Sequence, residues 1–112
     1  KPTALQVIPE KRILKADGVD LSFVRVLIVD SKGRMVPRAK NHLKFSVSGS
    51  AEIVATDNGD ATDLTSFQLP ERDAYNDMAL VILRSQYQKP GKAVLTVESK
   101  GLPKQKVVLN VE

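Results

Sequence analysis

The chain has 112 residues, of which 42% are hydrophobic and 27% charged, and its formal net charge at pH 7 is +4. These values are ordinary for a single folded globular domain with a small core, and they argue against intrinsic disorder. The chain contains no cysteine, which excludes disulfides, thiolate nucleophiles and zinc sites built from cysteine.

The first predicted element is an edge strand that spans residues 3–9 and 12–16 and is broken at Pro9. Proline has no backbone N–H to donate to a neighbouring strand, so it is confined to edges and strand ends. We therefore expect this segment to lie at the margin of a sheet.

Two later segments, residues 21–30 and 78–85, are apolar on both faces of a strand. Their apolar residues are Val24, Val26 and Ile28 against Phe23, Leu27 and Val29 in the first, and Leu80 and Ile82 against Val81 and Leu83 in the second. Short runs of this kind are typical of central strands. Fully burying each large apolar side chain contributes roughly 1.5 to 3 kcal/mol, so these two strands are predicted to anchor the core.

Three further segments alternate between apolar and polar residues, at 41–49, 93–99 and 106–112. Successive side chains of a strand point to opposite faces, so each of these segments is predicted to have one core face. The predicted core residues are Leu43, Phe45, Val47, Ala93, Leu95, Val97, Val107, Leu109 and Val111.

Turns that contain glycine separate these segments, at residues 16–18, 30–33, 89–91 and 100–103. About seven short strands at intervals of roughly 8 to 12 residues predict an all-β, immunoglobulin-like sandwich of two packed, mainly antiparallel sheets. We expect residues 1–112 to form this single domain.

The longest stretch without a strand pattern runs from Asp57 to Asp77, and connections of this length are often functional. Its first part clusters Asp57, Asn58, Asp60 and Asp63 around Gly59. An EF-hand loop would need glycine at the sixth position and glutamate at the twelfth, but Thr62 and Gln68 stand there when Asp57 is the first. An irregular cation site stays open, but a structural turn is favoured because Asp and Asn readily hydrogen-bond their own backbone.

No pattern in the chain predicts a catalytic site, a metal site or a cofactor. His42 is the only histidine and is expected to be a surface residue where a strand begins. Some pair among 13 acidic residues will reach glycosidase spacing by chance, but a small sandwich without tryptophan has little room for the sugar cleft such a pair serves. Scattered basic residues and only 4% aromatic residues disfavour nucleic-acid binding. No apolar run approaches the roughly 20 residues that cross a bilayer, so no membrane insertion is expected.

Several short motifs follow one another along the chain. They are A-D-G-x-D-L-S at 16–22, V-D-x-x-G-x-x-V-P at 29–37, F-x-V-x-G at 45–49, D-N-G-D at 57–60, Ser66-Phe67, A-L-V-I-L-R-S at 79–85 and G-x-x-x-L-T at 91–96. Together, over residues 3–112, they resemble the immunoglobulin-like domain near the C-terminus of many bacterial family-two glycoside hydrolases of the β-galactosidase type. One departure is Tyr75-Asn76-Asp77, where related sequences usually have Phe-Asn-Gly or His-Asn-Gly.

The resemblance implies an excised accessory domain of an enzyme that hydrolyses β-galactosides or related glycosides. In such enzymes two glutamates on a separate barrel domain carry the chemistry, so this chain is expected to be non-catalytic and D-N-G-D to be a turn. The expected partners are the other domains of the parent enzyme. The resemblance also implies a bacterial protein located in the periplasm or outside the cell.

Two functional classes stay open. In the first, the chain is an interaction module whose 57–77 loop and outward residues Leu27 and Val29 contact the parent enzyme or a subunit, unless neighbouring strands or lysine stems cover these two residues. The loop residues offered for contact are Asp57, Asn58, Asp60, Asp63, Phe67 and Tyr75. In the second, the chain is a carbohydrate-binding module that places Tyr75, Tyr87 or Phe67 against a sugar ring, although the chain has few aromatic residues and no tryptophan. A spacer in a bacterial surface adhesin is a third, weaker alternative.

Overall fold

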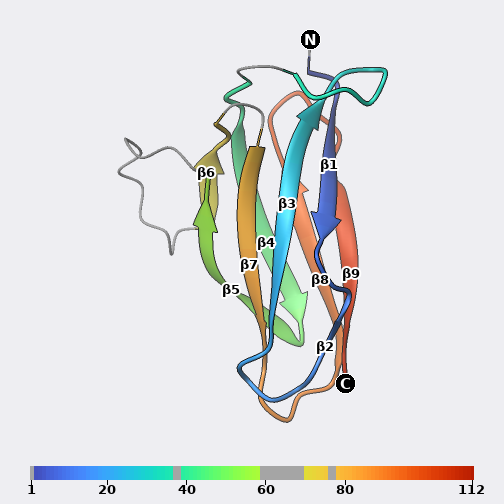
Figure 1. Ribbon diagram of the computed structural model, residues 1–112, viewed down its shortest axis with the longest axis vertical. Coiled ribbons are helices and arrows are strands. Elements are labelled where there is room, and N and C mark those ends of the chain that lie inside the picture. Colours follow the sequence, from blue (N-terminus) through green and yellow to red (C-terminus); the bar gives the residue numbers. More distant parts are fainter. Residues whose placement is uncertain (1, 37–38, 59–69, 76–77) are drawn as a thin grey trace.

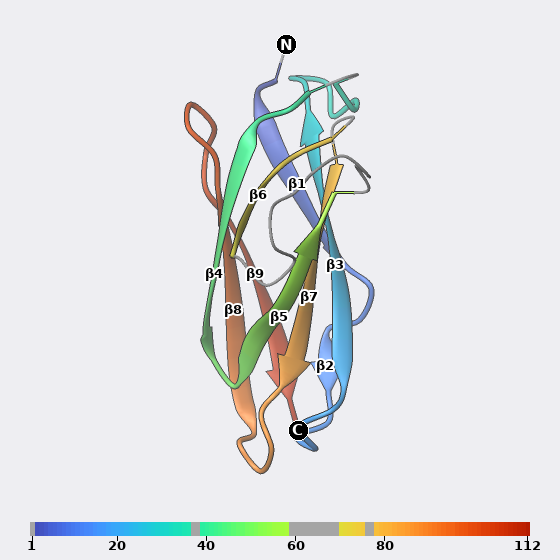
Figure 2. The ribbon, with the colours of Figure 1, turned by 90° about the vertical axis from the view of Figure 1, so that its left-hand side faces the viewer.

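The computed structural model describes residues 2–36, 39–58, 70–75 and 78–112, and these form two packed sheets (Figure 1). The strands are β1 (Ala4–Pro9), β2 (Ile13–Leu14), β3 (Leu21–Val29), β4 (His42–Gly49), β5 (Ala51–Asp57), β6 (Glu71–Asp73), β7 (Met78–Ser85), β8 (Gly91–Glu98) and β9 (Gln105–Val111). Figure 2 shows the two layers from the side. No helix long and apolar enough to span a membrane occurs among the described residues.

The sheet topology is that of an immunoglobulin-like sandwich. One sheet has the order β1-β3-β7-β5 and the other has the order β2-β9-β8-β4-β6. The four strands of the first sheet and β4, β8 and β9 of the second correspond to the seven strands of the immunoglobulin constant-type arrangement. The prediction of an all-β sandwich is therefore confirmed. The described part of the chain holds nine strands because two short ones, β2 with two residues and β6 with three, extend the edges of the second sheet.

The break at Pro9 separates two strands that belong to different sheets. The sequence predicted one interrupted edge strand, but β1 pairs antiparallel with β3 while β2 pairs parallel with β9. Pro9 ends the first pairing, and the N–H of Glu10 still donates to Phe23 O at 2.9 Å. The N–H of Asn110 then donates to Arg12 O at 2.7 Å, on the opposite sheet. The chain crosses between layers at the point where proline cannot continue the ladder.

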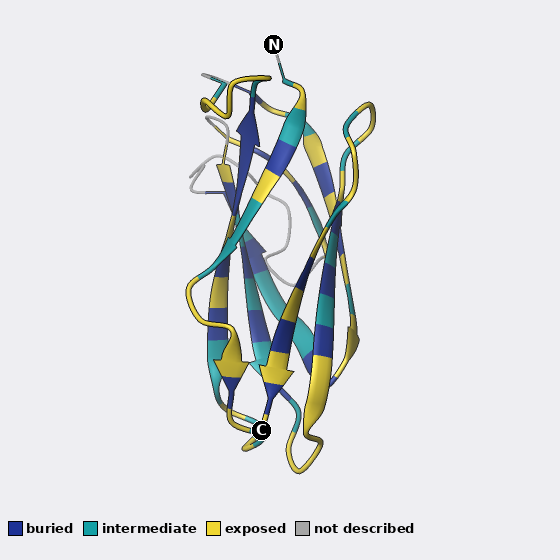
Figure 3. Ribbon diagram, turned by 90° about the vertical axis from the view of Figure 1, so that its right-hand side faces the viewer, coloured by how far each residue is buried: buried dark blue, intermediate teal, exposed yellow. Residues whose placement is uncertain are grey.

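The core lies between the sheets and is built as the strand patterns predict. β3 and β7 are the two central strands of the four-stranded sheet, and Val24, Val26, Val81 and Leu83 on their inner faces are fully buried. The predicted inward residues of β4, β8 and β9 are buried opposite them, except Val47, which packs against the core while partly exposed. Figure 3 shows the alternation of buried and exposed positions along the strands that this burial produces.

Leu27 and Val29 are covered within the domain, which is the alternative that the sequence left open beside a contact with a partner. Their side chains are only 8% and 5% exposed. The segment after β3 folds back along its end, where Met35 forms a bridge with Val29 and the N–H of Val36 donates to Ile28 O at 3.0 Å. The domain therefore covers this end of β3 with its own chain.

The segment from Asp57 to Asp77 also contains a strand that the sequence pattern did not predict. β6 pairs with the first residues of β4, with His42 opposite Asp73 and Lys44 opposite Glu71. It has no apolar residue to signal it, since its three residues are Glu71, Arg72 and Asp73. Backbone pairing with β4 therefore defines this strand.

Candidate functional site

The described residues of the predicted interaction loop make structural contacts at the end of β5. Asp57 is the last residue of this strand, and its Oδ1 accepts a hydrogen bond from the N–H of Asn58 at 2.8 Å. The side chain of Asn58 is buried, and its Nδ2 donates to Asp73 O in β6 at 2.7 Å. Asn58 thus joins the edge of one sheet to the edge of the other. Asp60, Asp63 and Phe67 lie outside the described residues, as does most of the loop.

The two tyrosines considered for sugar stacking do not share a surface. Tyr75 is 36% exposed and forms a bridge with Met78, the first residue of β7. Tyr87 is 69% exposed and follows β7 at the other end of that strand. Eight residues of strand lie between them, and a strand rises about 3.3 Å per residue. One sugar ring cannot contact both side chains.

Arg72 is a buried residue that sequence reasoning missed. It lies in β6, is only 1% exposed, and donates from Nε to Thr56 Oγ1 in β5 at 3.1 Å. β5 and β6 are the edge strands of the two sheets, so this bond crosses between the layers beside the Asn58–Asp73 contact. Side chains two residues apart in a strand lie on the same face. Arg72 therefore shares the inward face of Ala74, which is also buried, and this spacing was the one signal in the sequence that could have indicated its burial.

His42 begins β4, as predicted, and lies between two carboxylates of β6. Its Nδ1 is 2.6 Å from Asp73 Oδ1, and its Nε2 is 3.0 Å from Glu71 Oε1. The hydrogen bond to Asp73 is the main cause that raises the pKa of His42, and the bond to Glu71 adds to it, while partial desolvation acts in the opposite direction. The protonated imidazolium has two N–H donors and satisfies both carboxylates at once.

This arrangement predicts a pH-dependent contribution to stability. A folded-state pKa raised above the unfolded value stabilises the fold below about pH 6.5, and the contribution is lost as pH rises through the folded pKa. We expect His42→Gln to lower the free energy of unfolding in urea at about pH 6 and to have a smaller effect at about pH 9. Lys44→Gln removes a charge from the same strand but no imidazole, and serves as the control. An equal effect of His42→Gln at both pH values would contradict the prediction.

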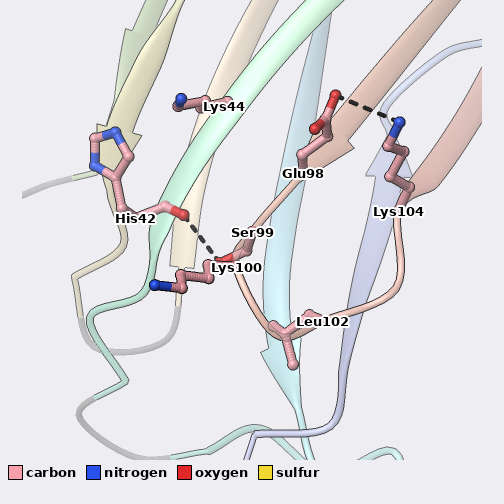
Figure 4. A pocket seen from close by; sticks show the side chains of 7 residues that line it. All are labelled: His42, Lys44, Glu98, Ser99, Lys100, Leu102 and Lys104. Atoms are coloured by element: carbon pink, nitrogen blue, oxygen red, sulfur yellow. Dashed lines mark hydrogen bonds and ion pairs between the residues drawn. The ribbon is translucent and has the colours of Figure 1, made fainter.

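A shallow cleft of about 490 Å³ lies beside His42, between the start of β4 and the loop that joins β8 to β9 (Figure 4). Its lining is mostly basic, with Lys44, Lys100 and Lys104 beside Glu98. Lys104 Nζ lies 3.9 Å from Glu98 Oε1. These charged side chains project into solvent, where ion pairs contribute little.

Serine and histidine meet in this cleft without forming a catalytic pair. Ser99 Oγ donates to the backbone oxygen of His42 at 2.9 Å, and both ring nitrogens of His42 contact carboxylates instead. A serine nucleophile needs its hydroxyl hydrogen-bonded to the imidazole that takes its proton. Among the described residues, no group of three His, Asp or Glu side chains is placed to hold a metal ion.

Comparisons with known proteins show that this chain is similar to small parts of much larger enzymes. The family model described as "Glycoside hydrolase family 2 C-terminal domain 5" matches residues 5–108. The beta-galactosidase BoGH2A of Bacteroides ovatus is 40% identical over 102 residues, which make up 91% of this chain and 12% of that protein. A crystal structure of a glycosyl hydrolase family 2 member from Bacteroides cellulosilyticus matches with a TM-score of 0.97 and 27% identity, over 100% of this chain and 14% of its own. A beta-glycosidase from Bacteroides vulgatus matches with a TM-score of 0.95 and 30% identity, over 99% of this chain and 14% of its own.

Proposed function

The chain belongs to the family of C-terminal domain 5 of glycoside hydrolase family 2, and from this premise we propose that it is a non-catalytic accessory domain of a β-galactosidase-type enzyme. Its role is to support the stability, domain packing or assembly of that enzyme in carbohydrate degradation. The resemblance drawn from the sequence motifs is confirmed by the same match, which extends from residue 5 to residue 108.

The observation that carries this proposal is the small share of each relative that the chain represents. It spans 12% of the Bacteroides ovatus β-galactosidase and 14% of each of the two solved glycosidases. Most of the polypeptide in these relatives therefore lies outside the region that matches this chain. A domain of about 100 residues suits a packing role, because inter-domain interfaces of 600–1,500 Å² fit on its surface.

The geometry of the described side chains supports a non-catalytic role. Asn58 and Arg72 link the two sheet edges. His42 is held between two carboxylates. The polar groups most suited to chemistry are thus engaged in contacts that hold the sandwich together, and a general base must instead be free to reach a substrate proton.

Deleting residues 1–112 from the full-length enzyme tests the proposal. We expect the truncated enzyme to lose several degrees of thermal stability, or to change its assembly state, while the turnover number of the remaining folded protein stays within a factor of a few. Thermal unfolding, light scattering and hydrolysis of a nitrophenyl galactoside measure these three properties. Hydrolysis of that substrate by residues 1–112 alone would refute the non-catalytic assignment.

A carbohydrate-binding role gains no support from the described side chains, because Tyr75 and Tyr87 lie at opposite ends of β7. Polysaccharide pull-down assays with the isolated chain are expected to detect no binding. Location in the periplasm or outside the cell stays a proposal that rests on the family resemblance.

A further inference from the structure

The two outer surfaces of the sandwich differ in chemistry. The five-stranded sheet presents mainly polar residues to solvent, among them Lys44, Ser46, Lys92, Glu98, Lys106 and Asn110. Its exposed large apolar residues are Ile13 at 57% and Val108 at 43%. The four-stranded sheet instead carries large apolar residues on its outer face, along its two central strands β3 and β7. Phe23 and Met78 are each 38% exposed there, and Leu80 and Ile82 are partly exposed. The solvent-exposed face of an antiparallel sheet normally carries polar residues.

Strand register gathers these residues into one patch, on the sheet where Figure 1 shows β5, β7, β3 and β1 side by side. Phe23 lies directly opposite Ile82, and Arg25 lies directly opposite Leu80. Side chains opposite each other on one face of a sheet have Cβ atoms about 5 Å apart and contact one another. We call the patch formed by Phe23, Leu80, Ile82 and Met78 around Arg25 the outer apolar face.

A hollow at one end of the outer apolar face adds a place for an anchoring side chain. It has a volume of about 180 Å³ and is lined by Arg25, Asp57, Asn58, Met78, Ala79 and Leu80. Met78, Ala79 and Leu80 make up the apolar half of this lining. Binding hot spots commonly form where one side chain of the partner fills a well-packed pocket.

Resting on the proposed accessory function, we propose that the outer apolar face docks this domain on the rest of its parent glycoside hydrolase. The partner surface is apolar and presents a carboxylate or main-chain carbonyl oxygen to Arg25. Exposed apolar patches rimmed by polar groups mark interaction sites. The relatives provide a partner in the same polypeptide, since 86% or more of each lies outside the matching region (100% − 14% and 100% − 12%). A covalently joined partner is present at an effective concentration of about millimolar, so a modest patch suffices.

Arg25 disfavours a second copy of this chain as the occupant. It is an exposed cation beside Leu80 and is surrounded by apolar residues of the patch. A two-fold contact centred on this patch would bring the two copies of Arg25 toward each other, because such an interface uses the same patch on both subunits. Like charges juxtaposed in an interface disfavour binding. A surface of the parent enzyme that presents a hydrogen-bond acceptor to Arg25 avoids this repulsion.

Photo-cross-linking in the full-length enzyme tests the docking face. A photoreactive phenylalanine derivative replaces Phe23 in one variant and Val108 in the other. Val108 is 43% exposed on the five-stranded sheet and is the matched control. We expect position 23 to cross-link, within one polypeptide, to peptides outside residues 1–112, with a yield at least several-fold above that from position 108. Comparable yields from both positions, or no cross-link from position 23, would overturn the inference.

Two further measurements separate the possible causes of failure. Mixing isotopically heavy and light enzyme identifies cross-links between copies, and such cross-links from position 23 would reject the docking proposal in favour of self-association. Arg25→Glu is expected to increase the rate of proteolytic release of the domain several-fold, whereas Lys106→Glu, an equal charge change on β9, is expected to leave it unchanged. Equal rates for the two variants would also count against the docking face. The accessory function itself is judged separately, from the stability and turnover of the enzyme that lacks residues 1–112.

Discussion

Replacing Arg72 with alanine is expected to lower the free energy of unfolding of this domain by about 3 to 5 kcal/mol, the range for truncating a large buried side chain. Arg72 is only 1% exposed and donates to Thr56 across the two sheets. The substitution removes both the side-chain volume and a charge-assisted hydrogen bond. Domains of this kind are stable by only about 5 to 15 kcal/mol, so the loss is a large share of the total.

Two matched variants show how much of this loss comes from side-chain volume and how much from the burial of the arginine. Arg72→Met keeps much of the side-chain volume and removes only the charge and its hydrogen bond to Thr56. We therefore expect Arg72→Met to be less destabilising than Arg72→Ala. Arg84→Ala removes an arginine whose side chain is 41% exposed and paired with Glu52 on the surface, and such pairs contribute about 1 kcal/mol or less. Urea unfolding measures all three, and an Arg72→Ala effect no larger than that of Arg84→Ala would contradict the structural role.

Gly49→Ala is expected to destabilise the domain by about 3 kcal/mol or more, through the combined costs of a left-handed backbone and a steric overlap. Gly49 has a φ of +91°, and a Cβ built there would lie 2.0 Å from Lys92 O. That oxygen belongs to β8 and accepts the N–H of Ser50 at 3.2 Å. The backbone on both sides is thus fixed, and relief of the overlap would disturb the junction of β4 and β5.

Gly101→Ala is the control for the backbone cost alone. Gly101 has a similar φ of +84°, but nothing lies within 4 Å of an added Cβ. The expected loss there is about 1 to 2 kcal/mol. The difference between the two variants measures the close approach at Gly49, and equal losses in urea unfolding would show that the overlap is absorbed without cost. Gly49 is also the last residue of the F-x-V-x-G motif, and this contact gives a physical reason for glycine at that place.

The predicted strands show which structural information is local. Residues 41–49, 93–99 and 106–112 were assigned from alternation alone, and β4, β8 and β9 fall on them within two residues. The two-sided apolar runs of β3 and β7 identified the central strands of one sheet. These successes share a cause, since side-chain direction in a strand follows from position along the chain.

The candidate site was harder to predict. Of the described loop residues offered for contact, Asn58 is buried and bonded to Asp73, so its amide is engaged within the domain. Arg72 was not singled out, because a cation between polar neighbours usually indicates a solvent face. Its partner Thr56 is 16 residues away in the chain, and the His42–Asp73 contact spans 31 residues. No local pattern encodes which distant polar groups will meet.

By itself, the sequence determined that this chain is an immunoglobulin-like sandwich, which strands lie at its centre, and which family it resembles. It did so because strand periodicity and short motifs depend on neighbours in the chain. Only the tertiary structure decided that the segments on either side of Pro9 join different sheets, that Leu27 and Val29 are buried within the domain, and that Arg72 links the two sheet edges. Those outcomes depend on which strand edges come together, and that is fixed by the packing of the whole chain around one core.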